Sequence, residues 1–297
     1  MTAGQSAGPG PRVVAVGGGH GLAATLRAVR PWAGSITAVV SVADDGGSSG
    51  RLRAEMEVVP PGDLRRCLAA LADAESPLGQ ALEHRFVSGS LAGHAVGNLL
   101  IVGLAEAGGD LVAALDEVGR LVGAAGRVLP AAVEPVVLMA GGANGAVEGQ
   151  SRVGQSTGLR RVGLRPSAPA SPPAVAAALA AADLVVLGPG SLLTSLLATC
   201  VVPAVAEALA TTAAIRVLVG NLGPQPGETE GLDADEHLAV LADHGVPVDV
   251  VVADPRFAPS TAAVPLVVEP IGDPERNVHD PDRLGAVLAG LVGPADA

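Results

Sequence analysis

Residues 12–29 read RVVAVGGGHGLAATLRAV. The short β-branched run at the start predicts a strand over Arg12–Val16. Glycines then break the run, and apolar residues recur on one face of a helix predicted over Leu22–Val29. A strand, a glycine turn and a helix in this order form the unit from which parallel sheets are built.

The same unit recurs along the chain. Ser35–Val42 is continuously apolar, as expected for a strand covered on both faces of a sheet. Further strands are predicted over Leu184–Leu187, Ile215–Val219, Val248–Val252 and Pro265–Val268. Helices are predicted over Asp63–Asp73, Gln80–Phe86, His94–Glu106, Asp110–Leu121, Pro173–Ala181 and Pro281–Leu291. Ser171 is expected to cap the helix at Pro173, and Asp233 and Glu236 are expected to form the capping box of one more helix. The alternation predicts an α/β fold: a Rossmann-like, doubly wound, mainly parallel sheet with helices on both faces.

The middle of the chain differs. Short strands with glycine-rich turns are predicted over Arg127–Leu129, Val136–Ala140, Val147–Gly154 and Leu159–Leu164. We therefore expect a small β-rich insertion at about 127–165 inside a single α/β domain spanning residues 11–292. Residues 1–10 and 293–297 are expected to be tails, the first of them flexible.

Composition excludes several classes of protein. The chain has 297 residues and no Lys, so all 18 basic residues are Arg and the phosphate-loop Lys of a P-loop NTPase is missing. The net charge is -12, and most of the acidic excess lies beyond residue 200. Such a surface repels nucleic acid, and aromatic residues at 1% provide no platform for stacking bases.

The remaining bulk features predict a cytoplasmic protein. Cys67 and Cys200 lack metal-ligand spacing and are expected to be reduced and buried. The first twelve residues do not have the pattern of a signal peptide. Residues 184–206 are free of charge, but glycines and prolines interrupt them, so a buried strand, loop and helix are predicted rather than a membrane span.

Glycine-rich loops follow the predicted strands, where open parallel sheets bind ligands. In Gly17–Gly21, glycines would let backbone amides approach an anion, and the following helix start favours phosphate. A simple tight turn is the alternative. Leu22 stands at the third glycine of G-x-G-x-x-G, which disfavours an NAD-dependent oxidoreductase.

The second loop, 44–53, reads DDGGSSGRLR. Asp44 and Asp45 suit ribose hydroxyls or a divalent ion beside a pyrophosphate. Ser48, Ser49 and Arg51 suit phosphate oxygens. A solvated flexible loop is the less favoured interpretation.

Three further segments carry candidates. Gly188–Ser195 is a second glycine turn before a helix, and two such turns fit a diphosphate. Asp63 opens a helix, and capping can be its entire role. His94 and Asn98 share a helix face, either as a buried polar pair or as ligand contacts. No catalytic set and no metal-ligand spacing stand out, so the residues predict binding more firmly than a reaction.

These loops together resemble a known family. The motifs G-G-G-x-G, A-D-D-G-G-S-S-G-R-L-R, P-P-G-D-L-R, G-H-x-x-G-N-L-L, G-P-G-S-L-x-T-S and N-L-x-x-Q-P-G-E-T-x-G occur in this order over residues 13–232. They resemble the gluconeogenesis factor (YvcK-type) family, which is related to 2-phospho-L-lactate transferase. The resemblance implies a Rossmann-like core and binding of a UDP-sugar such as UDP-N-acetylglucosamine. It also implies a role in growth on gluconeogenic carbon sources, in cell-wall synthesis and in cell shape.

The resemblance also implies a set of ligand residues. They are Gly18, Gly19, Gly21, Asp44, Asp45, Ser48, Ser49, Arg51, Asp63, Asn98, Gly190, Ser191, Asn221 and, in the closing segment, Arg276. Departures from the family pattern are His20 for Thr, Arg66 for Asn and Leu193 for Tyr, and Phe257 is the candidate to replace a second Tyr.

Two functions follow as hypotheses. The first is a regulatory UDP-sugar-binding protein with no established turnover. The second is a transferase that acts on a nucleotide-diphosphate-linked substrate with Mg²⁺ held by Asp44 or Asp45. The S-S-G-R-L-R run favours the regulator, because the transferase group usually lacks it. The expected partner is the UDP-sugar, with neither nucleic acid nor membrane, and a homodimer is left open.

Overall fold

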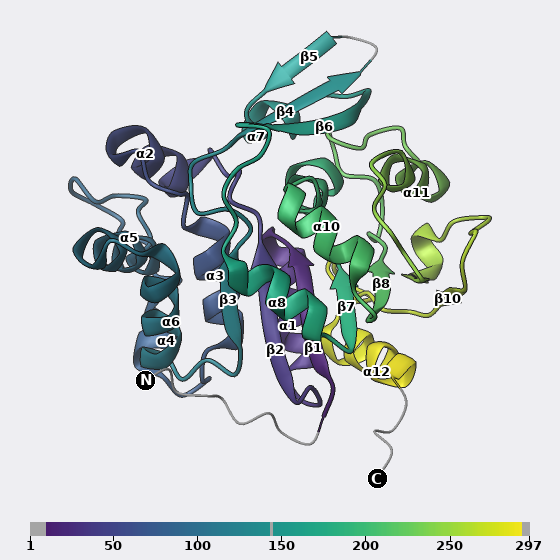
Figure 1. The fold of residues 1–297 in the computed structure, drawn as a ribbon, viewed down its shortest axis with the longest axis horizontal. Helices are drawn as coiled ribbons and strands as arrows, with labels where there is room; N and C mark the ends of the chain where they lie inside the picture. The colour runs from purple at the N-terminus through teal and green to yellow at the C-terminus, as the bar shows by residue number, and fades with distance from the viewer. Residues whose placement is uncertain (1–9, 143–144, 293–297) are drawn as a thin grey trace.

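A computed structural model describes residues 10–142 and 145–292, so the predicted tails lie outside the described residues except for Gly10. Within these ranges seven parallel strands form one sheet in the order β10-β9-β8-β7-β1-β2-β3 (Figure 1). The strands are β1 (Arg12–Gly17), β2 (Ser35–Val40), β3 (Arg127–Pro130), β7 (Leu184–Leu187), β8 (Ile215–Val219), β9 (Val250–Ala253) and β10 (Leu266–Val268). The predicted Rossmann-like α/β class is confirmed.

The strand order reverses beside β1. From β1 the chain builds outward through β2 to β3, and it then returns to β7 on the other side and builds outward to β10. β1 pairs in parallel with both β2 and β7. The carboxyl ends of β1 and β7 therefore flank a topological switch point, which is where open α/β sheets bind ligands.

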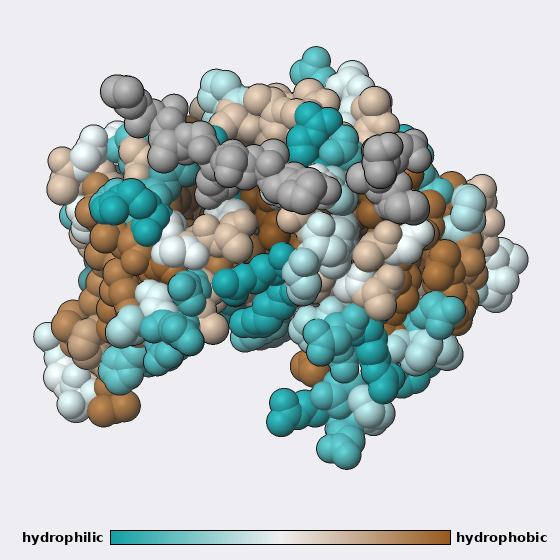
Figure 2. All heavy atoms as spheres, turned by 90° about the horizontal axis from the view of Figure 1, so that it is seen from below, coloured by the Kyte–Doolittle hydropathy of each residue, from teal (hydrophilic) through white to brown (hydrophobic). Residues whose placement is uncertain are grey.

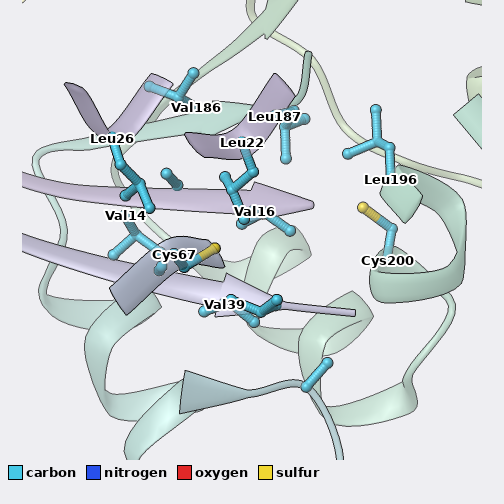
Figure 3. Packing of buried hydrophobic residues seen from close by; sticks show 14 of the residues in the cluster. Val14, Val16, Leu22, Leu26, Val39, Cys67, Val186, Leu187, Leu196 and Cys200 are labelled. Carbon is cyan, nitrogen blue, oxygen red and sulfur yellow. The ribbon is translucent and has the colours of Figure 1, made fainter. Parts of the chain in front are cut away.

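Helices cover both faces of the sheet. On one face lie α1 (Gly19–Val29), α3 (Gly62–Leu71) and α12 (Pro281–Val292), and on the other α8 (Pro173–Ala181) and α10 (Pro203–Thr211) (Figure 1). All residues of β1 after Arg12 are buried, as expected for a strand covered on both faces. Leu22 and Leu26 of α1 pack on Val14 and Val16, so small aliphatic side chains fill the core in place of aromatics (Figure 3).

The other helices among the described residues are short or lie at the edges. They are α2 (Gly47–Met56), α4 (Pro77–Ala81), α5 (Val96–Gly108), α6 (Leu111–Leu121), α9 (Ala198–Cys200), α11 (Ala234–Asp243), a π-helix over Leu192–Leu197 and a 3-10 turn over Pro255–Phe257. The capping box of Asp233 and Glu236 is confirmed. Ser171 does not cap α8, because Pro172 occupies the cap position and no side chain bonds there.

The helix predicted over Gln80–Phe86 is wrong. α4 ends at Ala81, and the chain then turns so that the Phe86 N–H donates to the His94 carbonyl. Arg85 and Ala95 pair across the same short ladder. Residues 84–95 thus form a hairpin-like loop. The apolar periodicity of residues 80–86 could not reveal it, because the residues that pair with this segment lie further along the chain.

The β-rich insertion is smaller than predicted. β4 (Val137–Gly142) pairs in antiparallel fashion with β5 (Gly145–Glu148) and β6 (Leu159–Arg165), and this three-stranded sheet projects beyond the main one (Figure 1). Arg127–Leu129 is not part of it, since these residues pair with β2 in the main sheet. The strand predicted over Val147–Gly154 ends at Glu148. Gly149 adopts φ +94, and α7 (Gln150–Val153) follows it.

Arg–Asp pairs fix the amino edge of the sheet. Arg12 bonds Asp183 before β7, Arg216 bonds Asp249 before β9, and Arg127 bonds Asp116, each at 2.7 Å. Hydrophilic side chains gather across the middle of this edge, seen from below in Figure 2. Such exposed pairs contribute at most about 1 kcal/mol each, so they set strand positions more than they stabilise the fold.

Among the described residues, no single helix has the length and apolar character needed to cross a membrane. Leu192–Cys200 and Pro203–Thr211 meet the criteria only as a pair, and a 74° bend separates them.

Candidate functional site

Two adjoining cavities open at the carboxyl edge of the sheet. The smaller, of about 320 Å³, we call the acidic cavity, because Asp44 and Asp63 line it together with Arg66. The other, which we call the larger cavity, has about 640 Å³ and is lined by residues 221–226 and 277–279. Their shared lining comprises His20, Gly21, Gln150, Gly190, Ser191, Thr194 and Gln225. The two cavities are therefore the halves of one crevice at the switch point.

The glycine turns after β1 and β7 are in direct backbone contact. A Cβ atom on Gly21 would overlap the Pro189 carbonyl oxygen, and it would stand 2.8 Å from the Gly190 nitrogen. The Thr25 hydroxyl donates to the Gly188 carbonyl at 2.9 Å and ties the turns together. The structure thus brings together Gly17–Gly21 and Gly188–Ser195, as predicted.

The start of α1 presents free donors to the crevice. Gly18 is the cap residue, and as a glycine it has no side chain with which to cap the helix. The Asp63 carboxylate lies beside the Gly18–Gly19 backbone, and the Leu22 N–H donates to the Gly18 carbonyl at 3.3 Å. No acceptor in the described part of the chain bonds the first-turn N–H groups of His20 and Gly21, so these are available to an anion, aided by the positive end of the helix dipole.

The second turn is different, because other parts of the protein occupy three of its N–H donors, those of Gly190, Leu193 and Thr194. The buried Glu228 carboxylate accepts from the Leu193 and Thr194 N–H groups at 2.6 and 3.3 Å and from the Thr194 hydroxyl at 2.8 Å. The Asn221 side chain accepts from the Gly190 N–H at 3.1 Å and donates to its carbonyl at 2.9 Å. Glu228 was missed from the sequence, although it is the acid of the N-L-x-x-Q-P-G-E-T-x-G motif. The two turns predicted to fit a diphosphate therefore differ in how many of their N–H donors are already occupied.

Asp63 is a cavity residue and does not cap α3. The cap position is Pro61, without a side-chain bond. The Asp63 carboxylate bonds Arg66 at 2.5 Å, and a Cβ atom on Gly18 would stand 2.6 Å from it. Asp44 is close by, since a Cβ atom on Gly62 would stand 2.7 Å from its Oδ2. Burial, together with the nearby Asp44 charge, raises the pKa of Asp63 despite the Arg66 partner.

The segment predicted as the loop 44–53 is largely helical, since α2 begins at Gly47. Asp45 accepts from the Ser151 N–H and hydroxyl at 2.8 and 2.5 Å, so it tethers the insertion. Ser48 is buried against His94 Nδ1 at 3.1 Å and Asn98 Nδ2 at 3.0 Å. Ser48 thus has partners away from the crevice, whereas Asp45 holds Ser151, a residue of the larger cavity's lining.

Several predicted ligand residues line neither cavity: Asp45, Ser48, Ser49, Arg51, Asn98 and Arg276. Arg51 is exposed and donates to the Ala92 carbonyl at 2.9 Å. Arg276 is exposed too, although its neighbours 277–279 form a wall of the larger cavity. Thr194 and Ser195 reach the crevice as part of the candidate segment Gly188–Ser195, whereas sequence reasoning did not name Ser41, Gln150, Gln225 or His279 as ligand residues, which the fold brings there from separate segments.

Comparison with known proteins agrees with this architecture. The family described as 2-phospho-L-lactate transferase CofD matches residues 13–265. The gluconeogenesis factor of Bacillus subtilis is 40% identical over 237 residues, covering 79% of this chain and 75% of that protein. The chain belongs to the gluconeogenesis factor family, within the CofD group. A Mycobacterium tuberculosis relative is 47% identical over 309 residues, which cover 94% of this chain and 90% of that one.

The fold of this family member matches a solved structure as well. A crystal structure of a UPF0052 family protein from Bacillus halodurans superposes with a TM-score of 0.88 at 33% identity, over 94% of this chain and 98% of that chain. The parallel sheet and the projecting small sheet therefore belong to an architecture that is known by experiment.

The donor set of the CofD-type crevice fits a divalent ion that enters with a phosphate ligand. The described residues contain no group of three or more His, Cys, Asp or Glu side chains arranged for a metal. Asp44 and Asp63 line one cavity, and Mg²⁺ in nucleotide sites is commonly held by one or two carboxylates plus phosphate oxygens. Asp44 would be the principal protein ligand, because Asp63 is bonded to Arg66 and Asp45 to Ser151. Such an ion would neutralise phosphate charge.

Proposed function

We propose that this gluconeogenesis factor acts in the cytoplasm as a regulatory protein that binds a UDP-sugar, UDP-N-acetylglucosamine, in the crevice. The observation that carries the proposal is the first turn of α1, where the His20 and Gly21 N–H groups have no acceptor within the described residues and lie between the acidic cavity and the larger cavity. A ligand with a central diphosphate and two bulky ends matches this arrangement, with the diphosphate at the start of α1 and one end in each cavity.

Each part of the ligand has a chemical match. The diphosphate would accept from the His20 and Gly21 N–H groups. Asp44 and Asp63 would accept hydrogen bonds from the hydroxyls of the sugar, which carboxylates bind well. The larger cavity, between residues 221–226 and 277–279, has room for the nucleoside. In this proposal the bound sugar reports the supply of cell-wall precursor and so links central carbon metabolism to wall synthesis and cell shape.

A ligand screen by thermal unfolding tests the proposal. A ligand that binds only the native state stabilises it by RT ln(1 + [L]/Kd), about 2.7 kcal/mol at a hundred times Kd. We expect UDP-N-acetylglucosamine to raise the melting temperature, and GDP and NAD to do so much less. Stabilisation by NAD or GDP alone would contradict the proposal.

A second candidate function is a phosphotransferase. The observation in its favour is the pair of carboxylates, Asp44 and Asp63, in one cavity of a CofD-type fold. Phosphoryl transfer relies on positioning and electrostatics, so it needs no special nucleophile. Purified protein is incubated with UDP-N-acetylglucosamine, Mg²⁺ and flavin-like or lactyl acceptors, and we expect no UDP, UMP or sugar phosphate above a no-protein control. Steady turnover that Asp44→Asn abolishes while binding persists would establish the transferase.

Substitution of two arginines should distinguish a residue of the crevice from one that lies outside it. Arg66 lines the acidic cavity, whereas Arg51 does not. Arg66→Ala is expected to weaken UDP-N-acetylglucosamine binding by about 1.5–3 kcal/mol, the scale of a hydrogen bond to a charged group. Arg51→Ala is expected to change affinity by less than about 0.5 kcal/mol, as an exposed substitution usually does. Isothermal titration measures both, and an equal loss in the two variants would place Arg51 in the site.

A further inference from the structure

His20 stands apart among the charged and titratable side chains of the crevice. Six such residues line it: His20, Asp44, Asp63, Arg66, Glu228 and His279. Arg66 is held by Asp63 at 2.5 Å, and His279 Nε2 contacts the Gly220 carbonyl at 3.0 Å. The exposed His20 ring has no hydrogen-bond partner in the described ranges, and it is among the few residues that line both cavities. It is therefore the side chain of variable charge that is available to a ligand.

The position of His20 brings its ring close to the N–H groups that are proposed to bind the diphosphate. It is the second residue of α1, and its own N–H is one of the two free donors of the first turn. A diphosphate bound there would lie beside the imidazole. An opposite charge within about 4–6 Å favours the protonated ring.

Free of ligand, the surroundings of the ring favour its neutral form. Partial desolvation of the ring beside the crevice, together with the positive charges of Arg66, Arg65 and Arg27, lowers the pKa of His20 below its ordinary 6.5, and Glu83 opposes them only in part. Asp44 and Asp63 line the acidic cavity with it, and Glu228 and His279 line the larger one. The start of a helix also disfavours a cation.

We infer that His20 takes up a proton when the diphosphate of the ligand binds, so that nucleotide-sugar binding is coupled to pH. The inference rests on the proposed function and adds a regulatory input to the same site. Because the complex then binds more protons than the free protein, affinity rises as pH falls between the two pKa values of His20. Uptake of at most one proton limits the change in affinity to tenfold per pH unit. Above both pKa values the affinity is independent of pH.

Asp63 is the other group that could account for proton uptake on binding, since its pKa is raised. The ligand itself does not take up a proton in this pH range. Both phosphates of a UDP-sugar are esterified, so it lacks the second ionisation of a terminal phosphate, which lies at about pH 6.

The test is isothermal titration of UDP-N-acetylglucosamine from about pH 5.5 to 8.5, in pairs of buffers with different ionisation enthalpies. The buffer difference measures protons taken up on binding, and the pH series gives the affinity slope. Wild type and His84→Asn, a His outside the crevice, should both show uptake and affinity that rises as pH falls. His20→Asn should bind without uptake, with affinity near that of wild type at the alkaline end.

Uptake that persists in His20→Asn but disappears in Asp63→Asn would overturn the inference and assign the proton to Asp63. Binding by wild type without uptake would also overturn it, while leaving the proposed function intact. No binding by wild type at any pH would contradict the proposed function itself. NMR titration of the His20 ring with and without ligand gives a second reading, and an unchanged ring pKa would again contradict the inference.

Discussion

Glu228→Ala is expected to lower the free energy of unfolding by about 3 kcal/mol, because hydrogen bonds to a charged group contribute about 1.5–3 kcal/mol and buried donors left without partners add their own cost. Glu228 is 4% exposed and accepts three hydrogen bonds at the start of the π-helix. Its loss leaves two N–H groups and a hydroxyl without their acceptor. Chemical denaturation of the purified variant measures the change.

Glu230→Ala is the matched control. Glu230 lies two residues away and is exposed, and its one acceptor contact among the described residues is with the Gly227 N–H at 3.2 Å. Its removal should cost less than about 0.5 kcal/mol, as exposed substitutions usually do. Similar losses in the two variants would show that Glu228 does not hold the second turn.

Gly21→Ala is expected to disrupt the crevice. The new methyl group would meet the Pro189 carbonyl and the Gly190 nitrogen, which are backbone atoms that cannot move without displacing the turn after β7. Overpacking of this kind costs about 1–3 kcal/mol of stability. We expect UDP-N-acetylglucosamine affinity to fall by at least about two orders of magnitude, because small misplacements of a binding constellation are costly. Thermal unfolding and isothermal titration together measure both effects.

Gly103→Ala is the control for that substitution. Gly103 is exposed within α5, and a Cβ atom there would meet no heavy atom within 4 Å. Ala is favoured over Gly in a helix interior by about 0.5–1 kcal/mol, so this variant should be slightly more stable with unchanged binding. Unchanged binding in Gly21→Ala would mean that contact between the two glycine turns does not shape the site.

The parts of the fold with regular local patterns were predictable. The apolar runs of β1, β7 and β8 and the glycine turns after β1 and β7 gave the parallel sheet and its functional edge. Helix α2 was not predictable, because its sequence is rich in Gly and Ser and Leu52 is its only buried apolar residue within the described chain. Contacts from other elements hold it, among them the bond of Ser48 to Asn98.

The candidate site was predictable in its location but not in the division of roles. Gly21, Asp44 and Asp63 line the crevice as expected. Asp45, which looked like a ligand residue, lines neither cavity and holds Ser151 in place, while Asn221 lines the larger cavity and also holds Gly190. A carboxylate or amide that binds a ligand looks the same in a sequence as one that supports a loop. Only the partner, here 106 or 31 positions away, distinguishes them.

A crystal structure of the complex with UDP-N-acetylglucosamine tests the central claim most directly. The account predicts diphosphate oxygens about 2.7–3.2 Å from the His20 and Gly21 backbone nitrogens, with Glu228 still bonded to Leu193 and Thr194. The sugar would lie against Asp44 and Asp63 and the nucleoside in the larger cavity. A diphosphate bound at the start of the π-helix in place of Glu228, or a ligand outside the crevice, would contradict it.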